Sequence, residues 1–391
     1  MADPELDLAS LASRIEQLEK QQETVAKYAL KIKRQLDNLT EQFNTRPELQ
    51  QMESLQEVIT NLSEAIAALH QQQNPQFSVN EMAEVSFTDL NEAEEIEDFA
   101  LESQSTTVSA EEFCRRVDEG ERDFTGINLA EVDLTGQHFP SGLNLSQANL
   151  TKTKLGRVSL RGVSIIGANL TEAELSKADL FQANLSHANL EKANLRKANL
   201  AAAKLEEVNL KEANLSGVEL QQASLYGANL NEANLSEAEL VQANLARADL
   251  AGANLIQANL SEVNLDEANL ESANLTVADL SRANLKNARL DGAKLSGTDM
   301  TGVNLMGASL SGLNLSGVCL SSANLCGTNL YGADLSGANL SSANLETADL
   351  REANLEQANL LQANLNDTNL GEGHEQANLS GAIMPDGTIY E

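Results

Sequence analysis

The sequence predicts an all-β solenoid of stacked coils, preceded by an α-helical coiled coil and an acidic linker. The first observation is an apolar residue at every fifth position from Leu145 to Leu370, 46 positions without a slip, all Leu except Ile165 and Met300. The second is a small or branched residue, most often Ala, two positions before each of them. The third is an alternating three-four apolar spacing from Leu8 to Phe43, which is typical of a coiled coil.

A period of five fits neither regular structure, because five residues turn an α-helix by about 140° net and move a strand residue to the opposite face. The same two positions of every five can stay buried only if an extended chain turns once per repeat. Four repeats then form one square coil of about 20 residues, and successive coils stack by backbone hydrogen bonds at about 4.8 Å. The 46 repeats predict about 11 coils and a rod of roughly 55 Å.

The other three positions of the repeat are expected to be turns. Glycines recur in steps of five from Gly292 to Gly317, at a position where the chain turns and a positive φ suits glycine. A phosphate-binding loop is the alternative interpretation, and the regular period favours turns. The Asn or Asp before each Leu is expected to satisfy turn backbone groups.

The run Ala-Asn-Leu-Ser-x-Ala-Asn-Leu resembles the pentapeptide-repeat family, over about 60 per cent of the chain. The resemblance implies a right-handed quadrilateral β-helix. The stretch from Gly120 to Phe124, Gly-Glu-Arg-Asp-Phe, is similar to one that family members carry before their first repeats. Some members protect DNA gyrase from inhibitors and resemble an acidic duplex in charge and width. The repeat itself carries no function, so the resemblance leaves the function open.

Residues 1–72 are expected to form a coiled-coil oligomerisation region. Pro47 breaks the phase, and a second apolar heptad run from Met52 to Leu69 is out of step with the first. The second helix either folds back as a hairpin or continues with a kink. In both cases the apolar seam requires a partner, most simply another copy of the chain. The first seam contains one polar residue, Gln22, and consists of Leu8, Leu11, Ile15, Leu18, Gln22, Val25, Ala29, Ile32, Leu36, Leu39 and Phe43.

Residues 73–108 are expected to be an acidic disordered linker. No Lys or Arg occurs between Pro47 and Cys114, and Glu81 to Glu102 holds nine acidic residues with few apolar ones. Such a composition is typical of disorder. The alternative is an acidic recognition helix that uses Ile96, Phe99 and Leu101.

Both ends of the solenoid are expected to be covered. In residues 109–120 a capping box from Ser109 to Glu112, with Phe113 and Val117 on one face, predicts an N-terminal cap helix. Gly120 is expected to end this helix.

The solenoid is expected to run over residues 121–370. A spacing of six between Phe139 and Leu145 predicts a bulge near Pro140. Residues 371–391 are expected to form a C-terminal cap, in which Met384, Ile389 and Tyr390 cover the last coil.

Composition excludes several classes of function. Aromatic residues are 3% of the chain, which leaves no stacking platform for single-stranded nucleic acid. No run of 18 apolar residues exists and the N-terminus is acidic, so neither a membrane span nor a signal peptide is expected. We expect no enzyme activity, no cofactor, no metal and a reducing cytoplasm. The residues considered were Cys114, Cys319, Cys326, His70, His138, His187 and His374, which lack the spacing or neighbours of a metal site or a catalytic triad.

Charge is distributed unevenly along the repeats, within a net charge of −32. Residues 145–215 carry 10 basic and 7 acidic groups, whereas residues 216–370 carry 6 and 18. Stacking at 20 residues places Arg157, Lys177 and Lys197 in one line, about 4.8 Å apart, with Arg196 beside them. These four are the candidate partner-binding residues, and the alternative is a solvated surface screened by salt. On the next side the signs alternate through Lys152, Glu172, Lys192 and Glu212.

The function expected from these features is a non-enzymatic scaffold or adaptor that binds protein partners through the faces of a rod, multimerised as a homo-oligomer by residues 1–72. No direct contact with nucleic acid is expected. The alternative, implied by the family resemblance, is an acidic DNA mimic that binds a DNA topoisomerase such as gyrase. The basic first coils interrupt the single-sign field that such mimicry requires.

Overall fold

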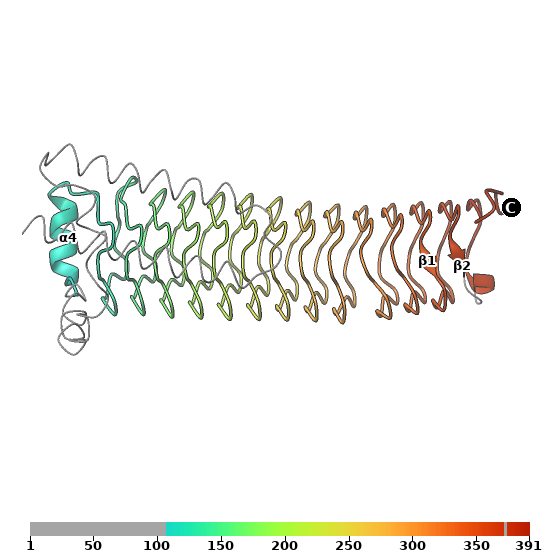
Figure 1. Ribbon diagram of the computed structural model, residues 1–391, viewed down its shortest axis with the longest axis horizontal. Coiled ribbons are helices and arrows are strands. Elements are labelled where there is room, and N and C mark those ends of the chain that lie inside the picture. Colours follow the sequence, from blue (N-terminus) through green and yellow to red (C-terminus); the bar gives the residue numbers. More distant parts are fainter. Residues whose placement is uncertain (1–106, 371–373) are drawn as a thin grey trace, which may run out of the picture. The chain divides into compact units, whose positions relative to one another are not determined.

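The computed structural model describes residues 107–370 and 374–391. They belong to a compact unit, Asp98–Glu391, whose coils stack into a rod (Figure 1). The expected coiled coil over residues 1–72 and the expected linker up to residue 106 lie outside the described residues, so both stay predictions. Among the described residues, no helix is long and apolar enough to cross a membrane.

The coils stack in parallel with a register of 20 residues. Single bridging residues pair from coil to coil, as Asn184 does with Lys204, and a two-residue turn follows each inward Leu. Four five-residue sides therefore make one coil. Each side contributes a very short extended segment. Within residues 107–370 and 374–391, only β1 (Asp349–Leu350) and β2 (Asn369–Leu370) are long enough to count as strands, and they pair in parallel.

The first coil is one residue longer than the rest. The last two parallel bridges, near the C-terminus, join residues 19 apart. Those of the first coil join residues 21 apart up to His138 and Ser159, and from Asn144 and Ser164 the step becomes 20. The extra residue falls between these two bridges, so the expected bulge near Pro140 is confirmed.

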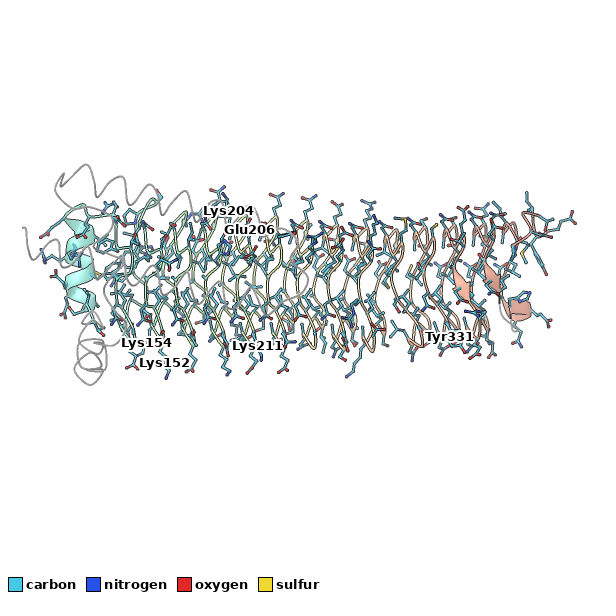
Figure 2. The ribbon with its side chains drawn as sticks, in the orientation of Figure 1. Lys152, Lys154, Lys204, Glu206, Lys211 and Tyr331 are labelled. Atoms are coloured by element: carbon cyan, nitrogen blue, oxygen red, sulfur yellow. The ribbon has the colours of Figure 1, made fainter. Side chains whose placement is uncertain are left out.

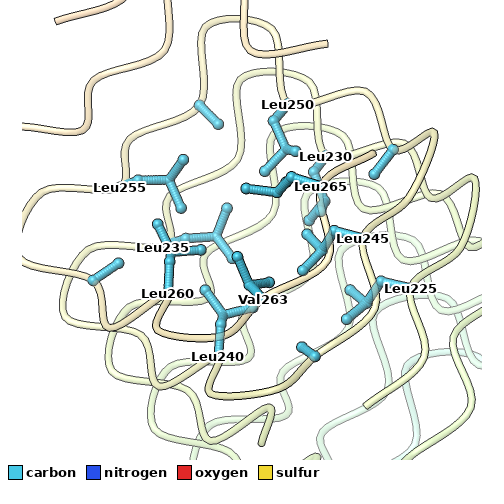
Figure 3. Close-up of a cluster of buried hydrophobic side chains, with 14 of the residues drawn as sticks. Leu225, Leu230, Leu235, Leu240, Leu245, Leu250, Leu255, Leu260, Val263 and Leu265 are labelled. Atoms are coloured by element: carbon cyan, nitrogen blue, oxygen red, sulfur yellow. The ribbon is translucent and has the colours of Figure 1, made fainter. Parts of the chain in front are cut away.

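The core consists of continuous files of side chains along the rod. Every apolar residue at the fifth positions from Leu145 to Leu365 is at most 2% exposed. Figure 3 shows such files, with Leu225, Leu245 and Leu265 one behind another in successive coils. Four Thr residues replace Ala inside, and each donates its hydroxyl to a carbonyl of a neighbouring coil, so no buried hydroxyl among them lacks an acceptor. They are Thr153, Thr298, Thr328 and Thr368, with distances of 2.8 to 3.0 Å.

Helix α4 (Ala110–Asp118) covers the first coil. Its N-cap is Ser109, whose hydroxyl accepts the Glu112 amide at 3.2 Å. The carboxylate of Glu112 binds Arg115 and not the cap, so the reciprocal half of the predicted capping box is wrong. Phe113 is fully buried, with its ring centroid 4.8 Å from that of Phe124 and 5.3 Å from that of Phe139.

The far end is closed differently from the expectation. After η2 (His374–Gln376), the chain adds part of a coil and then reverses, and Ile383 and Ile389 pair antiparallel. Met384 packs against the core as expected, but Ile389 and Tyr390 are 69% and 48% exposed, so their predicted role as a cover is wrong. A hairpin turn explains this. Asp386 accepts the backbone amide of Thr388 and Gly387 has a φ of 82°, which sends the tail back beside the coil edge.

One junction between coils is open on two adjacent sides, which we call the open junction. On one flank the usual bonds are intact, for example from the Leu285 amide to the Asn304 carbonyl (2.7 Å). On the other flank the Met300 amide still donates to the Cys319 carbonyl (2.9 Å), but the Cys319 amide has lost its bond. Figure 1 shows the wider gap between two coils in the orange part of the rod. Arg289 still pairs with Ser309 and Asp299 with Cys319 as parallel bridges, but Lys294 and Asn314 do not pair. Seven backbone amides there have no acceptor within 3.5 Å among the described residues: Leu290, Gly292, Leu295, Gly297, Ser309, Asn314 and Cys319.

The bulk of one side chain accounts for the open junction. Leu313 occupies the inward position that holds Ala, Val or Thr in every other repeat of the five-residue period except the first, where Leu143 stands. Leu313 stacks on Ala293 in the preceding coil. A larger side chain in a packed core forces the backbone to move. Leu313 and Ala293 are 5% and 7% exposed, whereas most of the core is at 2% or less. The coils therefore separate around Leu313.

Candidate partner-binding surface

The second residue of each turn has a left-handed backbone, and these residues stack into four lines along the rod, which we call turn columns. Thirty-two of them are not glycine, and the glycines predicted at this position, from Gly292 to Gly317, have φ values of 66° to 72°. The turn interpretation of these glycines is therefore confirmed. Because the turn projects its side chain outward, each column presents one residue per coil at the surface, exposed in most coils and half-buried in some.

Three cations occupy consecutive places in one turn column. Arg157, Lys177 and Lys197 have φ values of 55° to 58° and are exposed. We call these three residues the basic turn column. Glycine stands at each end of it, Gly136 before Arg157 and Gly217 after Lys197. The Lys197 stem lies over Gly217, with Cγ 3.4 Å from the place where a Cβ would stand. The column is therefore a short, isolated line of positive charge.

The cations of the basic turn column have no ion-pair partner among residues 107–370 and 374–391. The neighbouring turn column behaves differently. There Lys152 lies 3.6 Å from Glu172, and Lys192 lies 3.7 Å from Glu212, as their alternating signs predicted. Figure 2 shows Lys152, Lys154 and Lys211 along one edge of this part of the rod, and Lys204 and Glu206 along the opposite edge.

Arg196, the fourth candidate residue, lies just before Lys197 in the first turn position and not in the basic turn column itself. It too is exposed and has no ion-pair partner within the part of the chain that the structure describes. Its neighbours in adjacent coils are Ser176 and Ser216, which are small and uncharged. The structure thus brings all four candidate cations into one region.

The side that follows the basic turn column carries apolar surface that sequence reasoning missed. The guanidinium of Arg161 lies 4.4 Å from the ring centroid of Phe181, and its Nη1 donates to Asp179 at 2.9 Å. Phe181 and the next residue in its line, Ala201, are half-buried. The signal was available, because an alignment in steps of 20 places Arg161, Phe181 and Ala201 in line.

Nearby carboxylates are committed to internal hydrogen bonds. Asp179 also accepts the Phe181 amide (3.2 Å) and the Asn199 side chain (3.3 Å). Burial raises the pKa of the Glu174 carboxyl, but hydrogen bonds from Ser176 and Asn194 outweigh it and hold that pKa below its ordinary value. These acids are therefore satisfied without the basic turn column.

The remaining chemistry of the described residues is sparse. They contain no group of three or more His, Cys, Asp or Glu side chains that could hold a metal ion. Cys114, Cys319 and Cys326 are free thiols. The exposed cations of these coils therefore remain the candidate functional site of the described residues.

Comparison with known proteins identifies the repeat. The family described as pentapeptide repeats matches in eight copies that together span more than half of the chain. The copies cover residues 144–180, 173–211, 213–250, 243–282, 283–321, 308–346, 319–357 and 348–372. No curated protein matches the chain.

Solved structures of similar proteins carry the same repeat. HetL, a pentapeptide repeat protein involved in heterocyst differentiation regulation from the cyanobacterium Nostoc sp. strain PCC 7120, is 36% identical over 72% of this chain and 100% of its own, with a TM-score of 0.24. Full-length QnrB1, a plasmid-mediated fluoroquinolone resistance protein, is 20% identical over 40% of this chain and 79% of its own, with a TM-score of 0.32.

A pentapeptide repeat protein from the thylakoid lumen of Arabidopsis thaliana is 28% identical over 30% of this chain and 70% of its own, with a TM-score of 0.19. These TM-scores are low, so the family assignment rests on the matched repeats and not on the superpositions. This chain belongs to the pentapeptide-repeat family, and its fold is a right-handed repeat fold of the β-helix type.

Proposed function

We propose that this protein is a non-enzymatic scaffold whose rod, four-sided in cross-section, binds protein partners, and that the basic turn column and Arg196 bind an acidic partner. The observation that carries the proposal is a line of three exposed cations without an ion-pair partner among the described residues. Two unit charges about 5 Å apart in water repel by about 0.8 kcal/mol. An acidic partner would relieve this repulsion, whereas the paired cations of the neighbouring column gain little from one.

Multimerisation is the second part of the proposal. If residues 1–72 join several chains, each assembly presents several copies of the same weak site. Linked sites raise the effective concentration of the second binding event, so modest contacts give useful avidity. We propose this arrangement as the reason for a coiled-coil pattern at the head of a repeat rod.

A charge-matched pair of variants tests the binding site. The first is R157A/K177A/K197A. The second is K152A/K154A/K192A, which removes the same charge from two of the same three coils but from cations already paired with Glu172, Asp133 and Glu212. With labelled polyglutamate as the probe and fluorescence anisotropy as the readout, the first variant should bind about tenfold more weakly than the parent and the second within about twofold. Equal losses would reduce the site to a general effect of net charge.

The second candidate function is an acidic DNA mimic, favoured by the excess of acidic residues between residues 216 and 370. The basic turn column opposes it, because a duplex mimic requires one sign of charge along its length. A gyrase supercoiling assay with added protein separates the two functions. The scaffold leaves supercoiling unchanged, whereas inhibition at low protein concentration would favour the mimic.

A further inference from the structure

The spacing of the basic turn column selects the conformation of its partner. Its three cations stand one per coil, so the line spans about 9.6 Å along the rod at 4.8 Å per step. An α-helix places residues i, i+3 and i+7 on one face over about 10.5 Å. An extended strand places residues i, i+2 and i+4 on one face over about 13 Å. Flexible Lys and Arg side chains absorb a mismatch near 1 Å much more easily than one near 4 Å.

The surface beside the basic turn column suits a helix that is not only acidic. Phe181 and Ala201 are half-buried in the turn that follows the column in their coils, and Ala202, also half-buried, is the second residue of the same turn as Ala201. None of these three carries a charge. An acid beside them, Asp179, is bound by Arg161 and accepts two further hydrogen bonds. Among the described residues, a line of positive charge therefore lies next to a small apolar strip whose one neighbouring acid is already hydrogen-bonded.

We propose that this surface binds an acidic amphipathic α-helix of a partner protein, lying parallel to the rod axis. Its carboxylates at i, i+3 and i+7 face Arg157, Lys177 and Lys197. Its small apolar residues pack on Phe181 and Ala201. The inference rests on the proposed function and adds to it the conformation and the sequence pattern of the partner, which follow from charge complementarity and from the coil spacing.

Two peptides of identical composition test the proposal with the full chain. In one, Glu residues repeat at i, i+3 and i+7 with Ala and Leu on the adjacent face; in the other, Glu occupies every second position. The first should bind about tenfold more tightly, because it can make all three contacts and each exposed ion pair contributes up to about 1 kcal/mol. Circular dichroism should show that it gains helix on binding.

The variants assign the contacts. R157A/K177A/K197A should remove the preference for the helical peptide, and K152A/K154A/K192A should retain it. F181S should weaken the helical peptide about threefold to tenfold, as expected for losing a partly exposed apolar contact, and should leave polyglutamate unchanged. Circular-dichroism melts of the variants verify that the rod stays folded.

The outcomes distinguish a failure of the helical partner from a failure of the proposed binding site for an acidic partner. If both peptides bind the parent equally and both weaken with R157A/K177A/K197A, the acidic site stands and the helix is overturned. If neither peptide distinguishes the parent from that variant, the proposed function fails as well. If the helical peptide binds only after Glu95, Asp98 and Glu102 are replaced by Gln, the chain's own acidic segment occupies the surface, and a separate partner is overturned.

Discussion

Asn before the inward Leu makes two kinds of contact, of which the sequence predicted one. Its Oδ1 accepts the backbone amide two residues later, as Asn304 does from Met306 at 3.3 Å. Its Nδ2 donates to the Oδ1 of the Asn 20 residues earlier, from Asn264 to Asn244 (3.0 Å) and from Asn284 to Asn264 (3.0 Å). Asp accepts but cannot donate, so only Asn continues the ladder in both directions. This explains why Asn outnumbers Asp at the position.

Val277 is the least suitable residue for its backbone conformation. It has a φ of 60° and a side chain 57% exposed, so it bears the cost of a left-handed β-branched residue without burying its apolar surface. V277G should therefore stabilise the rod by about 0.5 to 1 kcal/mol, the left-handed strain relieved minus the extra entropy of glycine when unfolded. Chemical denaturation measures the change.

The matched control for this prediction is V263G, which makes the same substitution at a buried inward position outside the left-handed residues. It should destabilise the rod, because it removes core contacts and adds chain entropy. Equal losses in the two variants would show that the turn columns carry no strain.

At the scale of the element, each coil depends on its neighbours, and the open junction is the weakest contact between them. Intact sides exchange three backbone bonds per side, whereas the side at Leu295 has none to the following coil. In a stack of repeats, each contact between neighbouring coils contributes separately to stability. A single oversized side chain therefore affects the whole rod.

We expect L313A to stabilise the rod, whereas a large-to-small substitution in a core usually destabilises the fold. Removing a buried Leu side chain ordinarily costs about 2 to 5 kcal/mol. Here it should let seven backbone amides return to within 3.5 Å of their acceptors, at up to roughly 1 kcal/mol net each. We expect a more stable rod, a higher melting temperature, and slower hydrogen exchange at Leu290, Gly292, Leu295 and Gly297.

L315A is the control, because Leu315 is fully buried at an ordinary inward position of the same coil. It should destabilise by the usual amount and leave those amides exchanging rapidly. A loss of stability in L313A as large as in L315A would mean that Leu313 does not hold the coils apart.

At the scale of the whole molecule, the assembly is expected to depend on the N-terminal region. The seam from Leu8 to Phe43 would expose a long apolar line in a monomer. Light scattering on the full chain should therefore show an oligomer, and a fragment of residues 109–391 should be a monomer. An oligomeric fragment would move the interface into the rod.

The sequence predicted the rod well because one rule, two inward positions in every five, holds without interruption from Leu145 to Leu370. It missed the open junction, because Leu313 is as apolar as the Ala it replaces, and only its volume against Ala293 matters. It misplaced Ile389 and Tyr390, because apolar character does not reveal that the hairpin at Asp386 turns the chain away from the coil end.

The position of the candidate site could be predicted from the sequence, but whether its cations are ion-paired could not. Alignment in steps of 20 placed Arg157, Lys177 and Lys197 in line. Their lack of ion-pair partners within the described part of the chain could not be read from the sequence, because Asp179 stands close along the chain and its pairing with Arg161 is decided by side-chain geometry.

The open junction also decides how the rod responds to mechanical tension. A pull between the first and last coils passes through every junction in series, so the least bonded junction yields first. Its remaining backbone bonds, at Leu285 and at Met300, lie on the two sides flanking the gap and would carry the load unevenly. The rod should therefore part near Leu295 into two blocks of whole coils, at a lower force than any other junction requires, and the files of Leu within each block should stay intact.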